Sequence, residues 1–331
     1  MPRRQELGRG ERVIPGLWRL RLPLPLPGIP HCNAWAIAAG DGVVLVDTGM
    51  HERGSMAELE RSLAQVGLSL DRVRLLVCTH AHIDHWGQAA TIRDRAGCEF
   101  WLHPNHQHGF APVTDSEVAL ARRLEIGRQS GVPEPVLNRY AERSRGMASG
   151  IARVIEPDRP LVDGVEIETD LGSWRAFETP GHAPSHVCLF QAERRLLISG
   201  DHLLGRISLY FDYGWTHDPI GEFLSSLAVT DDLGARLALS GHGKPFIDVH
   251  GHVEANRKLV SERIDSVLTA VRNEPRTAVE IAPSLYGEEL TEGNTGWRLQ
   301  ETLCYLRHLE LAGRVSRESE GDLATWAGIA T

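Results

Sequence analysis

Apolar residues along this chain gather in short runs, and segments with helical spacing of apolar positions separate these runs. Short apolar runs bounded by turn residues are typical of buried strands, and Gly40-Asp41-Gly42 predicts a tight hairpin between two of them. Amphipathic spacing predicts helices at 53–66 and 88–95. The predicted strands cover residues 12–22, 33–39, 43–46, 73–78, 99–102, 162–168, 174–177, 195–200 and 237–240. This alternation predicts an α/β sandwich.

Two segments interrupt the alternation. Residues 23–30 are rich in proline, which predicts a connector without regular structure. Residues 104–150 carry many Arg and Glu residues and no apolar run, yet their apolar positions have helical spacing. Pro133 and Pro135 indicate a break between two helices. We therefore predict a helical insertion, or cap, over residues 104–150.

The C-terminal part of the chain has a different pattern. Residues 252–273 have the spacing of a long amphipathic helix, and 276–282 and 297–312 predict two more. Residues 313–317 predict a short strand after them. We predict a main domain over residues 1–250, which contains the insertion, and a small, mostly helical domain over 251–331.

Composition and charge narrow the classes of protein to consider. With 42% hydrophobic and 24% charged residues, the chain is an ordinary globular one. Its net charge of −9 disfavours general binding to nucleic acid or to an anionic membrane. No apolar window is long enough to span a membrane, and the charged first ten residues do not resemble a signal peptide. The five scattered cysteines predict small core residues, so a cytoplasmic location is the simplest expectation.

One short segment concentrates side chains that bind metals. His80, His82, Asp84 and His85 follow the predicted strand 73–78 within six positions. Isolated histidines in loops are common, and this chain has 16 histidines. Placing three imidazoles and a carboxylate close together costs free energy, however, unless they are paired or bind a cation. The cluster therefore indicates a metal site at a strand end, and its spacing suits two ions better than one.

The pattern His80-x-His82-x-Asp84-His85 resembles the signature of the metallo-β-lactamase superfamily of hydrolases. That resemblance implies a four-layer αββα sandwich, to which the insertion and the C-terminal domain are added. Three later segments, each at a predicted strand end, resemble the remaining motifs of the family. They imply metal ligands at His182, Asp201 and His242.

The resemblance also implies how the ligands divide. His80, His82 and His182 would hold one ion, Asp84, His85 and His242 would hold the other, and Asp201 would bridge them. Ligands without thiolate favour Zn²⁺, with iron or manganese as alternatives. Two such ions can hold a hydroxide that attacks a carbonyl, and Asp84 would orient it as a catalytic residue. Asp47 matches a residue that supports the metal loop, with a turn or helix cap as the alternative.

The motifs also separate the branches of the superfamily. Zinc β-lactamases lack an aspartate at the position of Asp201, and flavo-diiron oxygen reductases carry a glutamate at the position of His82. Persulfide dioxygenases lack part of the second ligand set. The resemblance therefore implies a glyoxalase-II-like hydrolase that acts on a thioester or activated ester, although its glutathione-binding residues are not recognisable. A lactonase and an RNA or DNA phosphodiesterase remain alternatives, whereas the intact ligands argue against a catalytically silent scaffold.

The predicted C-terminal domain resembles the winged-helix-like tail of some glyoxalase-II-like and endoribonuclease-like members. A nucleic-acid reader would present a basic face, but residues 251–331 contain 13 acidic and 9 basic residues. We therefore expect a packing or dimerisation module, a small-molecule substrate, no nucleic-acid or membrane partner, and a homodimer as the one protein partner to consider.

The residues that choose the substrate are harder to locate. Residues 206–215 are rich in aromatic side chains, which can line an acyl pocket or pack under the insertion. Tyr210 and Tyr213 are candidates to donate a hydrogen bond to an oxyanion. Three histidines, His103, His106 and His108, open the insertion, and we interpret them as loop and cap residues in preference to a third metal site.

Overall fold

Two β-sheets form the centre of the molecule. The computed structural model describes residues 7–26 and 28–329, so the first six residues, part of the segment in which no signal peptide was expected, lie outside the described residues. The first sheet has seven strands in sequence order: β1 (Arg9–Ile14), β2 (Leu17–Leu26), β3 (Ile29–Ala39), β4 (Gly42–Val46), β5 (Val73–Val77), β6 (Glu99–Leu102) and β7 (Arg159–Pro160). Neighbouring strands are antiparallel from β1 to β4 and parallel from β4 to β7.

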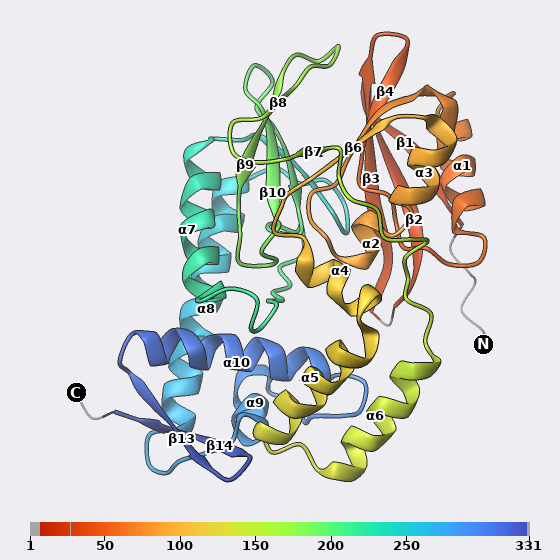
Figure 1. The fold of residues 1–331 in the computed structure, drawn as a ribbon. Coiled ribbons are helices and arrows are strands. Elements are labelled where there is room, and N and C mark those ends of the chain that lie inside the picture. The colour runs from red at the N-terminus through yellow and green to blue at the C-terminus, as the bar shows by residue number, and fades with distance from the viewer. Residues whose placement is uncertain (1–6, 27, 330–331) are drawn as a thin grey trace.

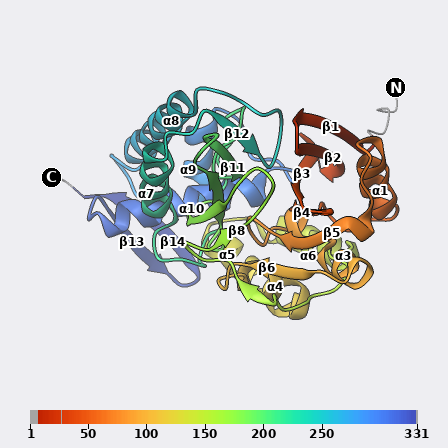
Figure 2. The ribbon, with the colours of Figure 1, turned by 90° about the horizontal axis from the view of Figure 1, so that it is seen from above.

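The second sheet is mostly antiparallel. Its five strands lie in the order β12 (Leu237–Ser240), β11 (Leu196–Gly200), β10 (Val187–Gln191), β9 (Trp174–Glu178) and β8 (Glu166–Ile167). Only β11 and β12 are parallel, because α7 (Pro219–Asp232) crosses between them. The two sheets lie side by side in the view from above, with helices on the outer side of each (Figure 2).

Alternation along β3 shows how the layers are built. Trp35 and Ile37 face the second sheet and pack in the cluster that contains Trp174 and Leu189. Their neighbours Ala34 and Ala36 face the opposite way, into the cluster that contains Leu59 of α1 (Ser55–Gln65). Because successive side chains of a strand point to opposite faces, this strand buries both of its faces. The short helices α2 (Ile83–Trp86) and α3 (Ala89–Ala96) complete the outer layer on this side.

On the outer face of the second sheet, α7 and α8 (Val249–Ala270) form the fourth layer. Phe223 and Leu227 of α7 pack with Leu197 of β11 and Val253 of α8 in one buried cluster. The four-layer αββα sandwich predicted from the family resemblance is thus confirmed (Figure 1). Among the described residues, no helix is both long and apolar enough to cross a bilayer.

The predicted helical insertion is also present. It contains α4 (Gln107–Thr114), α5 (Ser116–Gln129) and α6 (Glu134–Gly146), and the break between the last two falls at Gly131–Pro133. The insertion descends from the end of β6 and lies beside the C-terminal elements α9 (Ala278–Tyr286), α10 (Thr295–Leu311), β13 (Val315–Glu320) and β14 (Leu323–Gly328) (Figure 1). The backbone N–H of Val279 donates to the carbonyl of Ser130, which joins the two parts.

Helix α8 crosses the boundary that we predicted between residues 250 and 251. It packs against α7 of the sandwich and against α9 and α10 of the C-terminal part, so the domains share this helix. The boundary at that residue stays a prediction.

Two expectations about the first strands were wrong. Residues 12–22 form a hairpin and not one strand, because Gly16 adopts a φ of 83° and reverses the chain between β1 and β2. The proline-rich segment 23–30 does not lack regular structure, since β2 continues to Leu26 and pairs with β3 opposite Pro23. Within the described residues β1 pairs with β2 only up to Arg21, so the far end of β2 is an edge, where proline is tolerated.

Candidate metal centre

Loops from both sheets converge at one edge of the sandwich. The loop after β5 carries His80 and His82, with Asp84 and His85 in α2, and Asp47 follows β4 in the same sheet. In the second sheet, His182 follows β9, Asp201 follows β11, and His242 follows β12. Carboxyl ends of strands are where open sheets place their ligand sites. The structure therefore brings the seven predicted ligands together from loops that are far apart in the sequence.

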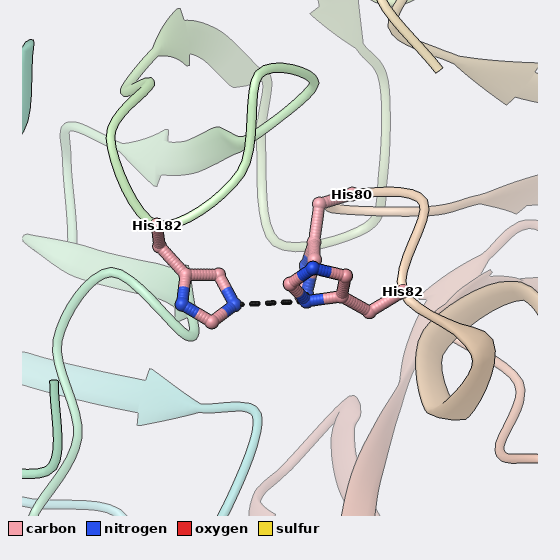
Figure 3. A group of neighbouring side chains, drawn as sticks. All are labelled: His80, His82 and His182. Atoms are coloured by element: carbon pink, nitrogen blue, oxygen red, sulfur yellow. Dashed lines mark hydrogen bonds between the residues drawn. The ribbon is translucent and has the colours of Figure 1, made fainter. Parts of the chain in front are cut away.

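Three imidazoles point their ring nitrogens at one another. Nδ1 of His82 lies 3.0 Å from Nε2 of His80 and 3.0 Å from Nε2 of His182. Figure 3 shows His182 approaching from one half of the sandwich and the other two from the opposite half. A tetrahedral metal ion with bonds of about 2.0–2.1 Å separates its ligand nitrogens by roughly 3.3 Å, so the spacing is close to that of a metal site.

The opposite nitrogen of each ring is already hydrogen-bonded. Nδ1 of His80 lies 3.0 Å from Oγ1 of Thr79, and Nδ1 of His182 lies 3.0 Å from the carbonyl of Tyr210. Nε2 of His82 lies 2.8 Å from a carboxylate oxygen of Asp212. The carbonyl and the carboxylate can only accept, and the Thr79 hydroxyl donates its proton to Asp47 at 3.0 Å, so all three rings carry a proton on the outer nitrogen. The three inner nitrogens then converge at the centre, which is a donor set that fits a cation.

A second group of side chains lies next to the first. Nε2 of His242 is 3.3 Å from Oδ2 of Asp84 and 3.0 Å from Oδ2 of Asp201. Asp201 also lies 3.6 Å from Nε2 of His85 and 3.8 Å from Nε2 of His182. Its carboxylate thus stands between the two groups of imidazoles, as expected for a residue shared by two ions.

Two buried atoms in this group lack a partner. Nε2 of His85 and Oδ1 of Asp201 have no hydrogen bond to any residue that the structure describes. The other ring nitrogen of His85 is held by Asp47 at 2.9 Å, and that of His242 is held by the carbonyl of His31 at 2.9 Å. Buried polar atoms are normally satisfied, so an unpartnered nitrogen and carboxylate oxygen facing each other fit a divalent cation.

The protonation of the centre follows from burial and charge. Burial and the neighbouring His82 lower the pKa of His182 to about 4, so this ring is neutral at pH 7. Burial also opposes charge on His242, but Asp201 and Asp84 outweigh it and raise its pKa to about 10. The pKa of the Asp201 carboxyl is depressed despite its burial, because His242 and His85 lie against it. Without a cation, protons on His242 and His85 balance the two carboxylates.

Asp47 and His186 support the ligand loops. Asp47, in the left-handed region with a φ of 65°, accepts a hydrogen bond from the backbone N–H of Thr79 at 2.8 Å and holds His85 from behind. Nε2 of His186 accepts hydrogen bonds from the backbone N–H groups of Asp201 and His202, at 3.1 and 3.2 Å. These contacts fix the backbone of two ligand loops.

Sequence reasoning missed Asp212 and misjudged His108. Asp212 lies alone in an aromatic loop, at no spacing that marks a ligand, and only the fold places it against His82. His103 lies in the loop after β6, near Glu178, and His106 occupies the N-cap position of α4. His108 instead reaches the metal loop, where Nδ1 lies 3.0 Å from Asp212. The crowding of histidines at the start of the insertion was the only available signal.

The two tyrosines take different positions. The Tyr210 ring lies 5.8 Å from the rings of both His82 and His182, but its hydroxyl donates to Asp212 at 3.1 Å. The hydroxyl proton of Tyr210 is therefore already donated to Asp212 and does not point to a substrate oxyanion in this arrangement. Tyr213 is partly buried against the cluster that contains Tyr305 and Val315 of the C-terminal domain. Their roles in substrate binding stay a prediction.

Comparison with known proteins identifies the family. The sequence profile described as the metallo-beta-lactamase superfamily matches residues 27–242, which is more than half of the chain. The chain belongs to the metallo-β-lactamase superfamily. A second profile, described as the metallo-beta-lactamase-like C-terminal domain, matches residues 264–326. The superfamily binds divalent metals, and the His/Asp groups of this centre have the donors to do so.

Relatives and solved structures agree with that assignment. The chain is 25% identical to the probable metallo-hydrolase YqjP of Bacillus subtilis over 299 residues, which cover 86% of this chain and 90% of the relative. It is 27% identical over 188 residues to the atrochrysone carboxyl ACP thioesterase of Aspergillus chevalieri, covering 52% and 57%. The crystal structure of the metallo-beta-lactamase family protein TTHA1429 from Thermus thermophilus matches with a TM-score of 0.82 and 27% identity, over 96% of this chain and 100% of that one.

Proposed function

We propose that this protein is a dinuclear metal-dependent hydrolase of thioesters or related activated esters, in the glyoxalase-II-like branch of the superfamily. The observation that carries the two-ion proposal is the pair of adjacent donor groups with Asp201 between them. One group presents three converging ring nitrogens, and the other presents Nε2 of His85, which lacks a hydrogen bond among the described residues, beside Oδ1 of Asp201. Within each of the groups His80, His82, His182 and Asp84, His85, His242, the donor atoms lie within 4.8 Å of one another, which supports one cation in each group.

We assign one ion to His80, His82 and His182 and the other to Asp84, His85 and His242, with Asp201 shared. Nitrogen and oxygen donors without thiolate favour Zn²⁺, with iron or manganese as alternatives. Bound ions of this kind supply a hydroxide nucleophile at neutral pH and polarise the substrate carbonyl. The protein holds the donors in place, and Asp84 stays ionised because its pKa is depressed by the neighbouring His85 and His242 in spite of burial. An ionised Asp84 can accept a hydrogen bond from the attacking nucleophile and so orient it.

Two observations support a thioester substrate. Relatives of the chain in Aspergillus chevalieri and Claviceps purpurea are named atrochrysone carboxyl ACP thioesterases. A thiolate leaving group needs little protonation. This suits a site in which the predicted ligand histidines are already held by supporting residues and are not free to act as a general acid. We further propose that the C-terminal domain is a winged-helix-like packing module, since acidic residues outnumber basic ones in it.

The test compares three substrate classes under the same conditions. Thiol release from acyl-CoA and acyl-glutathione should exceed turnover of lactones and of bis(p-nitrophenyl) phosphate, and Asp84→Asn should lose this activity. Asp163→Asn, at an exposed carboxylate that lies 3.9 Å from Arg175 and is none of the predicted ligands, is the matched control and should keep it. Failure with thioesters together with metal-dependent phosphodiester turnover would reject the substrate class. Fewer than about two metals per chain by elemental analysis would reject the dinuclear centre.

A further inference from the structure

Asp212 is the meeting point of three proton donors. It lies in the segment between β11 and α7, and its side chain is 12% exposed. His82 approaches Oδ2 through Nε2 at 2.8 Å, His108 approaches the same oxygen through Nδ1 at 3.0 Å, and the Tyr210 hydroxyl donates to Oδ1 at 3.1 Å. An ionised carboxylate only accepts hydrogen bonds, so each of these three partners must present a proton.

The hydrogen bonds continue from His108 back to the metal loop. With its proton on Nδ1, His108 accepts at Nε2 from the hydroxyl of Ser185, 2.8 Å away. Ser185 in turn accepts from the backbone N–H of Ala81 at 2.9 Å. Ala81 is the neighbour of His82 in the chain, so the hydrogen bonds close a ring that runs through Ser185, His108 and Asp212. Every proton in this ring has one position that satisfies all partners.

The segment that carries Asp212 is itself held by the C-terminal domain. Phe211 is fully buried, and its ring lies 6.1 Å from that of Tyr305 in α10. On the other side of Asp212, His108 belongs to α4 of the insertion. Gly109 permits the close approach of this helix, because a Cβ there would lie 1.9 Å from the carbonyl oxygen of Ala81.

We propose that Asp212 is a positioning residue that, together with His108 and Ser185, keeps the proton of His82 on Nε2 and aims Nδ1 at His80 and His182. The role rests on the metal centre proposed above. His82 is the one ligand imidazole among the five that turns Nδ1 inward, because the other four are held through Nδ1 and present Nε2. Its orientation therefore depends on a partner that the other four do not share.

A cation among His82, His108 and Asp212 is the competing interpretation, since their donor atoms lie within reach of one another. Such an ion would require His82 to lose both ring protons, because Nδ1 already faces the first group. The 2.8 Å hydrogen bond from His82 to Asp212 has the length of a charge-assisted one, and His108 lies 3.0 Å from the same carboxylate oxygen as an ion-pair partner. The geometry therefore favours hydrogen bonds over a third ion.

The experiment measures metal binding without relying on turnover. Asp212→Asn keeps the volume but removes the charge and one acceptor, and Asp212→Ala removes every acceptor. Zinc affinity, measured by competition with a chelator, should fall about 10- to 100-fold for the site of His80, His82 and His182 in Asp212→Ala, and by less in Asp212→Asn. The visible spectrum of the Co²⁺-loaded variants should change, because the ligand field at His82 is altered.

Asp218→Asn is the matched control. Asp218 belongs to the same segment, accepts from His308 at 3.0 Å and caps α7 at Gly221, but contacts no ligand. Its loss should lower thermal stability and leave zinc affinity and the cobalt spectrum as in the wild type.

Three outcomes would overturn the proposal. Folded Asp212 variants with wild-type affinity and spectrum would remove this role and leave the metal centre intact. Three tightly bound metals per wild-type chain would replace the hydrogen-bond ring with a third site. A wild-type chain that binds no metal would reject the proposed function and this role with it. Should Asp212→Ala fail to fold, Asp212→Asn decides between these outcomes.

Discussion

At the scale of single residues, each ligand imidazole is oriented by one neighbouring atom. A carbonyl, a hydroxyl or a carboxylate accepts a hydrogen bond from the outer ring nitrogen, so that the inner nitrogen faces the centre. Where carboxylates face the inner nitrogen instead, as at His242 and His85, the metal-free ring gains a proton. The centre therefore has a different proton content with and without metal.

Metal uptake should release protons. Burial disfavours the charged form of His242, but Asp201 and Asp84 raise its pKa to about 10, so below that pH the metal-free ring is protonated. A bound cation must displace this proton and the one on His85, about one to two protons per chain at about pH 7.5. Affinity should therefore rise with pH up to about 10. Calorimetric titration in buffers of different ionisation enthalpy measures the release, and equal heats in all buffers would contradict it.

Replacement of Asp47 should weaken the fold as well as the site. Asp47→Ala leaves the buried N–H of Thr79 and the Nδ1 proton of His85 without an acceptor. We expect a loss of about 2–4 kcal/mol in the free energy of unfolding of metal-free protein, measured by urea denaturation. Asp170 also accepts a backbone N–H, that of Gly40 at 2.9 Å, but in an exposed position. Asp170→Ala is the control and should change stability by less than about 0.5 kcal/mol.

The motifs that resemble those of the family place each predicted ligand at or after the end of an apolar strand, and strand ends meet at one edge of a sheet. His80, His182 and Asp201 are all recognisable in this way. Asp212 could not be found, because its contact with His82 depends on how the loop after β11 is packed from outside. The sequence around it shows only aromatic residues, whose partners lie about 90 positions away in α10.

At the scale of elements, α4 lies unusually close to the metal loop. The distance leaves no room for a side chain at Gly109, where a Cβ would meet the Ala81 carbonyl oxygen at 1.9 Å. The spacing of apolar residues predicts a helix in this insertion. The close contact between the helix and the metal loop could not be predicted, because no pattern in residues 104–114 indicates the loop against which they pack. The same limit applied to β2, whose prolines suggested irregular structure although the strand continues.

Gly109→Ala should displace α4. Backbone must shift to accept the new methyl group, which typically costs about 1–3 kcal/mol and moves His108 away from Asp212. Thermal denaturation should show the loss, and zinc affinity should fall with it. Gly146→Ala is the matched control, because Gly146 ends α6 of the same insertion and its Cβ would meet nothing within 4 Å. Equal behaviour of the two variants would argue against a tight contact at Gly109.

At the scale of the whole molecule, one hydrophobic cluster runs from the second sheet into the C-terminal domain. Leu197 of β11, Phe223 of α7, Val260 of α8 and Leu303 of α10 belong to it. The pattern of the sequence predicted two domains, with the boundary between residues 250 and 251, just before the amphipathic helix predicted at 252–273. Spacing along a helix shows that it has an apolar face, but not that two domains bury that face together.

The chain should therefore unfold in one transition. A shared core couples its parts, so Leu303→Ala, which truncates a side chain that is 5% exposed, should lower stability by about 2–5 kcal/mol and shift a single calorimetric peak. Leu311→Ala, in the same helix but 40% exposed, is the control and should shift it little. Two separate peaks, of which only one moves, would contradict a common core.

The prolines of β2 have a consequence for the behaviour of the protein at high concentration. Pro23 and Pro25 lie in the last four residues of β2, where the pairing with β3 is irregular after Pro23, and the N–H group that Pro23 lacks would have pointed to one edge of the strand. Since β3 still pairs opposite Pro23, we infer that this is the outer edge, beyond the end of β1. An edge without donors is a poor template for a strand of another molecule. Pro23→Val with Pro25→Val should restore those donors and make the protein aggregate sooner in light scattering, with its metal centre intact.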